Sequence, residues 1–282
     1  MRFSKNIIAA AMVSFGLSAT MASAGSIFLT GHDPDFHTSL GGNTTGARNI
    51  NTTAIGFVTD PAFNTFAADG VTKFLFVESN ISVPSGHTVG ENGIIASGYM
   101  ATTNFDQVNA SGLNTALNLL GIQYNAIVVA SDFGGILTQA ELDILNTRSP
   151  DIINFLNAGG GLYAMAESNL GARLTPNGGQ FGFLPFIVAS SALNQSESGF
   201  TVTPFGTSLG LANSDINGNA SHNIFTSTGG MTVVDMDGQG NIMSLATRSQ
   251  VTSGGVVPEP STVLLLGLGL AGLAAWRRKQ TA

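Results

Sequence analysis

Four short apolar runs constrain the fold of this chain more than any other feature of its sequence. Each is rich in β-branched, aromatic or large aliphatic residues and has the length of a strand buried on both faces. The runs are SIFLT at 26–30, KFLFV at 73–77, AIVVA at 126–130 and GLYAMA at 161–166. Helical patterns separate them, and strands that alternate with helices build a parallel sheet through right-handed crossovers. The sequence therefore predicts an α/β fold, a flavodoxin-like three-layer parallel sheet.

The segment between the last two runs carries the clearest helix signals. Thr138 and Glu141 are spaced as in a capping box, and an apolar face follows, interrupted at Pro150. The glycines at 159–161 then end the helix and lead into the next strand. This strand, helix and glycine-terminated return form one βαβ unit.

After about residue 180 the pattern changes to strands joined by turns. Residues 200–204 favour a strand, and 231–235 and 241–247 favour two more, joined at 237–240 by Asp-Gly-Gln-Gly. We therefore expect a C-terminal β-hairpin, an α/β domain over 25–250 and a linker over 251–257.

The first 24 residues have the order of a secretory signal peptide. Arg2 and Lys5 precede an apolar run at 7–17, and Ala22 and Ala24 form a small-x-small cleavage site before Gly25. We expect a signal helix, export through the Sec translocon, and cleavage by signal peptidase before Gly25.

The last 25 residues contain a second apolar run between a proline pair and a basic cluster. Pro258, Glu259 and Pro260 precede the uncharged stretch 262–276, and basic residues follow it at 277–279. Fifteen residues at 1.5 Å per residue span about 22 Å, less than the roughly 30 Å of a bilayer core. The basic residues Arg277 and Arg278 hold that end in the cytoplasm. We expect a transmembrane helix at about 262–276 that anchors the chain only transiently in the inner membrane.

These three parts together resemble the PEP-CTERM sorting signal over residues 258–282. The resemblance implies that an exosortase-type membrane protease recognises the tail and cleaves it. It also implies delivery to the cell surface or to an extracellular exopolysaccharide matrix, with polysaccharide as a further candidate partner. Because such tails occur on many unrelated exported domains, the resemblance leaves the role of residues 25–250 open.

Charge and cysteine content exclude several classes of function. Between residues 25 and 257 there are five basic and sixteen acidic residues, so we expect no nucleic-acid partner. The chain has no cysteine, which excludes disulfides, cysteine-ligated metals and thiol nucleophiles.

The stretch 124–167 resembles the class I glutamine amidotransferase-like fold, in the style of its ThuA-like members. Residues 221–223 and 228–230 match a late loop and closing strand of such domains. The resemblance implies a fold rather than an activity, because the cysteine that amidotransferases carry after the strand at 162–166 is absent. Ser168 with His222 is a conceivable substitute, but Ser168 lacks the glycines of a nucleophile elbow, which favours a helix-capping role.

Acidic residues follow each of the four predicted strands, where ligands bind in open parallel sheets. Carboxylates suit Ca²⁺ or Mg²⁺, and imidazoles add ligands for a transition metal. One argument against a cation is that the helix N-termini at this edge carry partial positive charge and favour anions. A second interpretation is that these residues cap helices and close loops without binding a ligand. The candidate ligand edge comprises His32, Asp33, Asp35, His37, Glu78, Asp132 and Glu167.

Two functions remain open from the sequence. The first is an exported, non-enzymatic protein with a binding or structural role, with no catalytic residue and no cofactor assigned. The second is a surface hydrolase or metal-dependent enzyme that acts on a carbohydrate or amide, with a divalent cation at the candidate edge.

Overall fold

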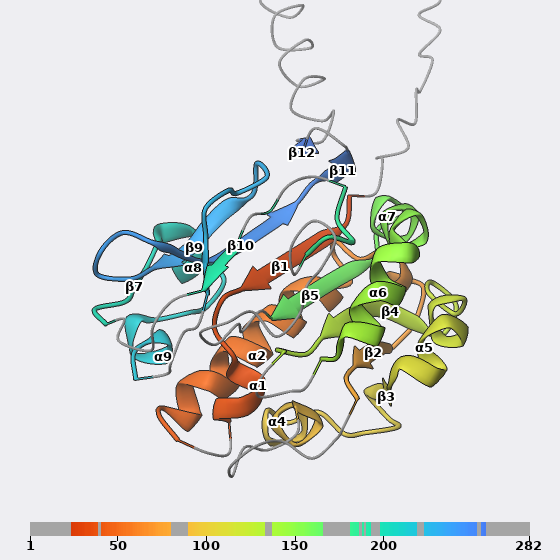
Figure 1. Cartoon of the computed structure of the whole chain (residues 1–282), viewed down its shortest axis with the longest axis horizontal. Helices are drawn as coiled ribbons and strands as arrows, with labels where there is room; N and C mark the ends of the chain where they lie inside the picture. Colours follow the sequence, from red (N-terminus) through yellow and green to blue (C-terminus); the bar gives the residue numbers. More distant parts are fainter. Residues whose placement is uncertain are drawn as a thin grey trace, which may run out of the picture.

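A computed structural model gives the arrangement of the chain (Figure 1). Residues 1–23 of the predicted signal peptide, the predicted membrane helix and residues Glu167, Ser168 and His222 lie outside the described residues. Those residues are 24–38, 41–79, 90–132, 137–165, 181–185, 188, 190–192, 198–218, 223–252 and 255–257.

Five parallel strands form one half of the central sheet, in the order β3-β2-β4-β5-β1. The four runs predicted to be strands are confirmed as β1, β2, β4 and β5. The sequence missed β3, which is short, has one fully buried residue, Phe105, and among the described strands pairs with β2 alone. The strands are β1 Ser26–Thr30, β2 Lys73–Val77, β3 Phe105–Val108, β4 Tyr124–Val129 and β5 Gly161–Met165.

The order of these strands is a rotated form of the flavodoxin-like order. A flavodoxin-like sheet runs 2-1-3-4-5. If β2 is counted as the first strand and β1 as the fifth, the order 3-2-4-5-1 becomes that order. The chain's first strand therefore occupies the position of a last strand. It lies between β5 and β10, and all five of its residues pair with each neighbour.

The other half of the sheet is antiparallel, so the sheet is mixed rather than wholly parallel. The predicted C-terminal hairpin is confirmed as β9 and β10, and β10 pairs with β1. Its turn is closed by Asp237, whose Oδ1 accepts hydrogen bonds from the backbone N–H groups of Gln239 and Asn241, both 2.8 Å long. The strands are β6 Ser190–Ala192, β7 Thr201–Val202, β8 Asn223–Phe225, β9 Thr232–Met236 and β10 Ile242–Arg248.

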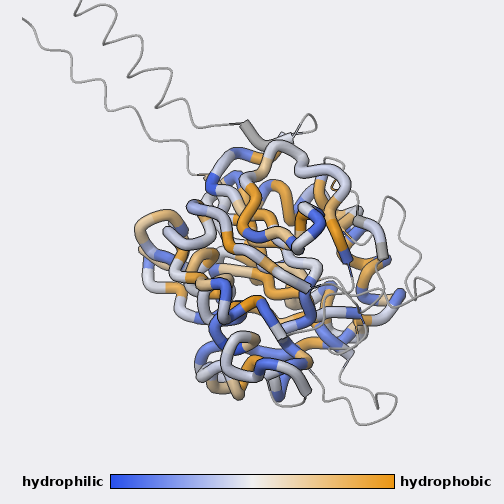
Figure 2. The backbone as a smooth tube through the Cα atoms, turned by 90° about the vertical axis from the view of Figure 1, so that its left-hand side faces the viewer, coloured by the Kyte–Doolittle hydropathy of each residue, from blue (hydrophilic) through white to orange (hydrophobic). Residues whose placement is uncertain are grey.

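Helices cover both faces of the sheet and make three layers. Alternate residues of β1 point to opposite faces. Phe28 packs in one core with Ile50 of α2 and Ile94 of α4, whereas Leu29 packs in the other with Leu113 of α5. Hydrophobic segments gather in the centre of the molecule (Figure 2). The helices are α1 Pro34–His37, α2 Thr44–Thr59, α3 Thr65–Ala68, α4 Gly90–Ala96, α5 Ala110–Leu117, α6 Gln139–Thr147, α7 Ser149–Asn157, α8 Pro204–Ser208 and α9 Asn213–Ile216.

The predicted helix between β4 and β5 is present as two pieces. The capping box at the start of α6 is confirmed, since the backbone N–H of Thr138 donates to Oε2 of Glu141 over 2.7 Å. The helix is then interrupted at Arg148, and Pro150 lies in the first turn of α7. Proline is tolerated there because an N–H group at that position has no partner within the helix.

Residues 251–257, expected to be a linker, contain most of a second hairpin. It is formed by β11, Gln250–Thr252, and β12, Gly255–Val257. Its Val251 is buried, and both backbone groups of Val251 bond to the side chain of Asn157 at the end of α7. The hairpin is therefore fastened to the domain.

Candidate functional site

The carboxyl ends of β1, β2 and β4 bring four acidic side chains together. Asp33 and Asp35 follow β1, Glu78 follows β2, and Asp132 follows β4. We call these four residues the acidic edge. Their side chains are covered: Asp33, Asp35 and Glu78 have 0% relative exposure and Asp132 has 5%. The sequence thus predicted the location of these residues but not their burial.

Asp35 connects the segment after β1 to the end of β4. Its Oδ2 accepts the backbone N–H of Ser131 at 2.9 Å, and its Oδ1 accepts the Ser131 hydroxyl at 2.8 Å. Burial raises the pKa of Asp35, while these bonds from Ser131 and a third from the N–H of Phe36 act to lower it. The side chain is therefore held firmly by hydrogen bonds, as buried carboxyl groups require.

Asp33 lies in the most acidic surroundings. Burial raises its pKa well above the usual range, and the negative charges of Asp35 and Asp132 raise it further. His37, one turn along the chain, places its Nε2 3.3 Å from Oδ1 of Asp33. The candidate residues Asp33 and His37 therefore form a pair within the edge.

Glu78 joins the edge to α4. Its Oε1 accepts the backbone N–H of Glu91 in the first turn of α4 over 2.9 Å. Burial raises the pKa of Glu78 to about 8, with a further contribution from the charge of Asp35. At neutral pH this carboxyl group holds its proton and is able to donate a hydrogen bond.

His32 points away from the acidic edge. Its Nε2 lies 2.8 Å from Oδ2 of Asp235 in β9, and both side chains are buried. The ring packs edge-on against Phe200, with 5.4 Å between centroids. The predicted grouping of His32 with the other candidates is therefore replaced by a contact across the sheet to the hairpin.

The sequence did not indicate several residues that lie around the acidic edge. Tyr163 of β5 donates its hydroxyl to Oδ1 of Asn51 over 2.9 Å, and Asn51 donates to the carbonyl of Pro34 at the start of α1. Burial and the charge of Asp35 raise the pKa of Tyr163 well above its usual value. The sequence could have indicated Ser131, because it lies directly before Asp132 at the end of a predicted strand. For Asn51, in the middle of a helix, there was none.

The described residues include no group of three or more histidine and acidic side chains placed to hold a metal ion. Glu167, the candidate after β5, lies outside the described part of the chain. The carboxyl groups of the acidic edge are covered, and burial raises the pKa values of Asp33, Asp35 and Glu78. Such groups are suited to hydrogen bonding with each other and with backbone.

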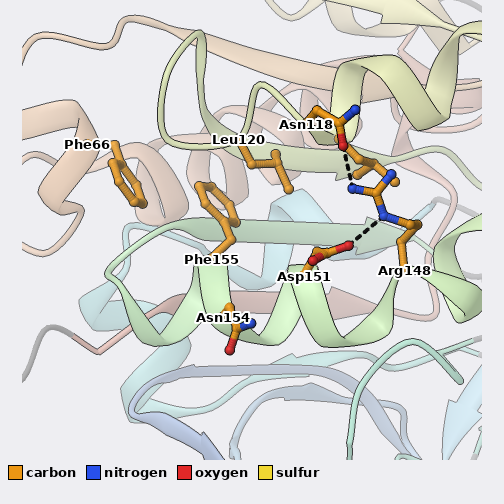
Figure 3. Close-up of a pocket in the computed structure, with 8 residues that line it drawn as sticks. Phe66, Asn118, Leu120, Arg148, Asp151, Asn154 and Phe155 are labelled. Atoms are coloured by element: carbon orange, nitrogen blue, oxygen red, sulfur yellow. Dashed lines mark hydrogen bonds and ion pairs between the residues drawn. The ribbon is translucent and has the colours of Figure 1, made fainter.

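Two surface hollows lie away from the acidic edge. One, of about 370 Å³, is lined by residues of α3, α5 and α7, with Phe66 and Phe155 on one side and Arg148 on the other (Figure 3). In this hollow Arg148 is ion-paired with Asp151 and donates to Oδ1 of Asn118 over 2.7 Å. The other hollow, of about 380 Å³, lies beside Arg248, between α2 and α8.

Comparison with known families identifies one feature of the chain. Residues 256–279 match the PEP-CTERM protein-sorting motif. Neither a search of curated proteins nor a search of solved structures gave a match. Within the part of the chain that the structure describes, no helix is both long and apolar enough to cross a membrane. The motif supports a chain that is a substrate of an exosortase, with export and transient anchoring through its C-terminus.

Proposed function

We propose that this chain is an exported protein delivered to the cell surface or extracellular matrix through its tail, and that its α/β domain has a binding or structural role. The observation that carries the proposal is the sorting-motif match at residues 256–279. In this proposal the Sec translocon moves the chain across the inner membrane and signal peptidase cleaves before Gly25. The apolar run at 262–276 then arrests the tail until an exosortase cleaves it.

The test of this route is replacement of Pro258, Glu259 and Pro260 by alanine in a host that carries an exosortase. The prolines keep the segment outside the bilayer extended and non-helical. We expect export to continue and processing to stop. Mass spectrometry of the purified protein measures the outcome, and an unchanged mature C-terminus in the variant would contradict the assignment.

A non-catalytic role for the domain is supported by two features of the described residues and the sequence. There is no cysteine to act as an amidotransferase-like nucleophile. The acidic edge is covered by the domain's own structure, and the hydrogen bonds of its described residues include those to Ser131 and to the first turn of α4. These bonds serve to join the ends of β1, β2 and β4.

A second candidate function is a surface hydrolase or metal-dependent enzyme that acts on a carbohydrate or amide. The observation that favours it is the convergence of Asp33, Asp35 and Asp132, since raised carboxyl pKa values cluster at catalytic sites. Titration of residues 25–257 with Ca²⁺, Mg²⁺, Mn²⁺ and Zn²⁺ tests the metal-dependent form of this candidate. A cation at 100 times its dissociation constant stabilises the native state by about 2.7 kcal/mol. We expect no rise in melting temperature; a clear rise that is lost in Asp33→Asn would favour the enzyme.

A further inference from the structure

The described part of the domain ends almost at the apolar run of the tail. β12 ends at Val257, and only residues 258–261 separate it from that run. Four residues reach at most about 14 Å. The headgroup layer on one side of a bilayer takes up about 5 to 7 Å of this length. When the apolar run is inserted, the distance left between the domain and the headgroup surface is therefore about one Debye length or less.

The hairpin from which the tail leaves is fixed to the domain. Asn157 donates from Nδ2 to the carbonyl of Val251 over 3.0 Å and accepts the Val251 N–H over 2.8 Å. Gly255 of β12 packs closely on the turn before β9, because a Cβ atom at Gly255 would lie 2.7 Å from the carbonyl oxygen of Gly229. The tail therefore leaves the domain from a hairpin whose position on the domain is fixed.

This attachment is at the amino ends of the parallel strands. Asn157 ends α7, and β5 begins four residues later. The N–H of Ser26, the first residue of β1, donates to the carbonyl of Gly160 just before β5. Figure 1 shows β11, β12 and α7 at one end of the domain, with α1 and α4 toward the opposite end. The acidic edge lies at that opposite end.

Exposed apolar side chains concentrate at the end that carries the tail. Of the four large hydrophobic residues that are exposed in the described chain, three lie in segments that precede parallel strands. Phe63 (47% exposed) precedes α3 and β2, Met100 (60%) precedes β3, and Ile122 (73%) precedes β4. The fourth, Ile95, lies on α4. Aromatic and aliphatic side chains placed in this way are suited to the headgroup boundary of a bilayer.

The charges at this end nearly cancel, and the exposed Asp69 at the end of α3 adds one further negative charge. Lys73, Arg148 and Arg248 are three of the four basic residues that the structure describes, and each is ion-paired with an aspartate. The Arg248 guanidinium also stacks 3.5 Å from the ring centroid of Phe63. The stacking places this paired cation beside an exposed apolar side chain, so the proposed contact depends on apolar residues rather than on net charge.

We propose that the loops at the amino ends of the parallel strands form a lipid-facing surface, on which the domain rests while its tail is inserted. Phe63, Met100 and Ile122 touch the bilayer, and the acidic edge faces away from it. This inference rests on the proposed function, because it requires the tail to enter a membrane.

The sequence makes the orientation measurable with few changes. The chain has no cysteine and one tryptophan, Trp276, which is in the tail. Full-length chain exported in a host without an exosortase is reconstituted into vesicles of phosphatidylethanolamine and phosphatidylglycerol. Ile122→Cys and the control Asn92→Cys, which is exposed on α4, are labelled with an environment-sensitive dye. Headgroup-linked nitroxide lipids quench the dye, and brominated lipids quench Trp276.

We expect Trp276 to be quenched in both variants. We also expect the dye at residue 122 to be quenched at least about twofold more strongly than the dye at residue 92, because surface-bound apolar groups enter the headgroup region by about 5 to 10 Å. Equal quenching at the two labels, with Trp276 quenched, would overturn the orientation and leave the sorting route standing. An unquenched Trp276 would overturn membrane arrest itself and the inference with it. Asn157→Ala, which frees the hairpin, is expected to reduce the contrast between the two labels.

Discussion

The most unusual residue of the described chain is a carboxyl group that keeps its proton at neutral pH. Glu78 directly follows β2 and has no exposed surface, and burial raises its pKa to about 8. Around it, Asp35 is held by Ser131, and Asp33 lies close enough to Asp35 and Asp132 for their charges to raise its pKa. Burial disfavours the charged form of each of these groups.

This burial makes stability depend on pH in a direction opposite to that of most acidic residues. The folded state holds the Glu78 proton up to about pH 8, whereas a glutamate in the unfolded chain loses it near pH 4.5. Between these values the folded state binds more protons than the unfolded state. The free energy of unfolding therefore falls as pH rises through this window, by up to about 1.4 kcal/mol per pH unit for one such group.

Glu78→Gln tests this expectation. The amide oxygen can still accept the N–H of Glu91, but the side chain no longer titrates. We expect a stability close to that of the unmodified chain at pH 4, and a higher stability at pH 8 by a few kcal/mol. The pH dependence is reduced but not removed, because Asp33 and Asp35 also have raised pKa values. Urea unfolding at pH 4, 6 and 8 measures this, with Asp69→Asn, at an exposed acid at the end of α3, as a control. Parallel pH profiles for Glu78→Gln and the unmodified chain would contradict the account.

At the scale of single residues, sequence located most of the candidate site but not its contacts. The positions after β1, β2 and β4 followed from the rule that parallel strands end at one edge. The contact of His32 with Asp235 could not be predicted, because it depends on how β9 pairs with β10 in the antiparallel half of the sheet. Pairing between segments two hundred residues apart leaves no local pattern.

Among the strands, those with strongly apolar sequences were predicted correctly, and one with little apolar content was not. β1, β2, β4 and β5 are apolar throughout or nearly so, because both faces of each strand are covered. β3, with the sequence FDQV, is an edge strand with little apolar content and was missed. The linker prediction failed for a different reason. The hairpin of β11 and β12 is fixed by the side chain of Asn157, which no pattern near residue 251 reveals.

Asn157→Ala tests whether this side chain fastens the hairpin. The substitution removes two hydrogen bonds, one from and one to the backbone of Val251. A typical hydrogen bond contributes about 1 kcal/mol. We expect the amide of Val251 to exchange with solvent roughly tenfold faster or more, with little change for amides of β4. Hydrogen exchange followed by NMR measures this. Asn154→Ala, on the exposed face of the same helix, serves as the control. Unchanged exchange at Val251 would show that the hairpin is held by other contacts.

At the scale of the whole molecule, the two ends of the sheet differ in chemistry. The carboxyl ends carry covered acids, whereas the amino ends carry exposed apolar side chains and the attachment of the tail. The rotated strand order contributes to this arrangement, because it puts β1 beside β5 and so places both the first described residues and the last near α7. The sequence predicted the layers of this fold but not the rotation, since strand order depends on pairings that apolar runs do not specify.

In the proposed function the two termini direct delivery, and the domain is what they deliver. The most direct test is to map both ends of the mature protein by mass spectrometry, after expression in a bacterium with an exosortase. We expect a mature chain that begins at Gly25 and ends close to Pro258, Glu259 and Pro260. A protein that retains Met1 and Ala282 in that host would contradict it.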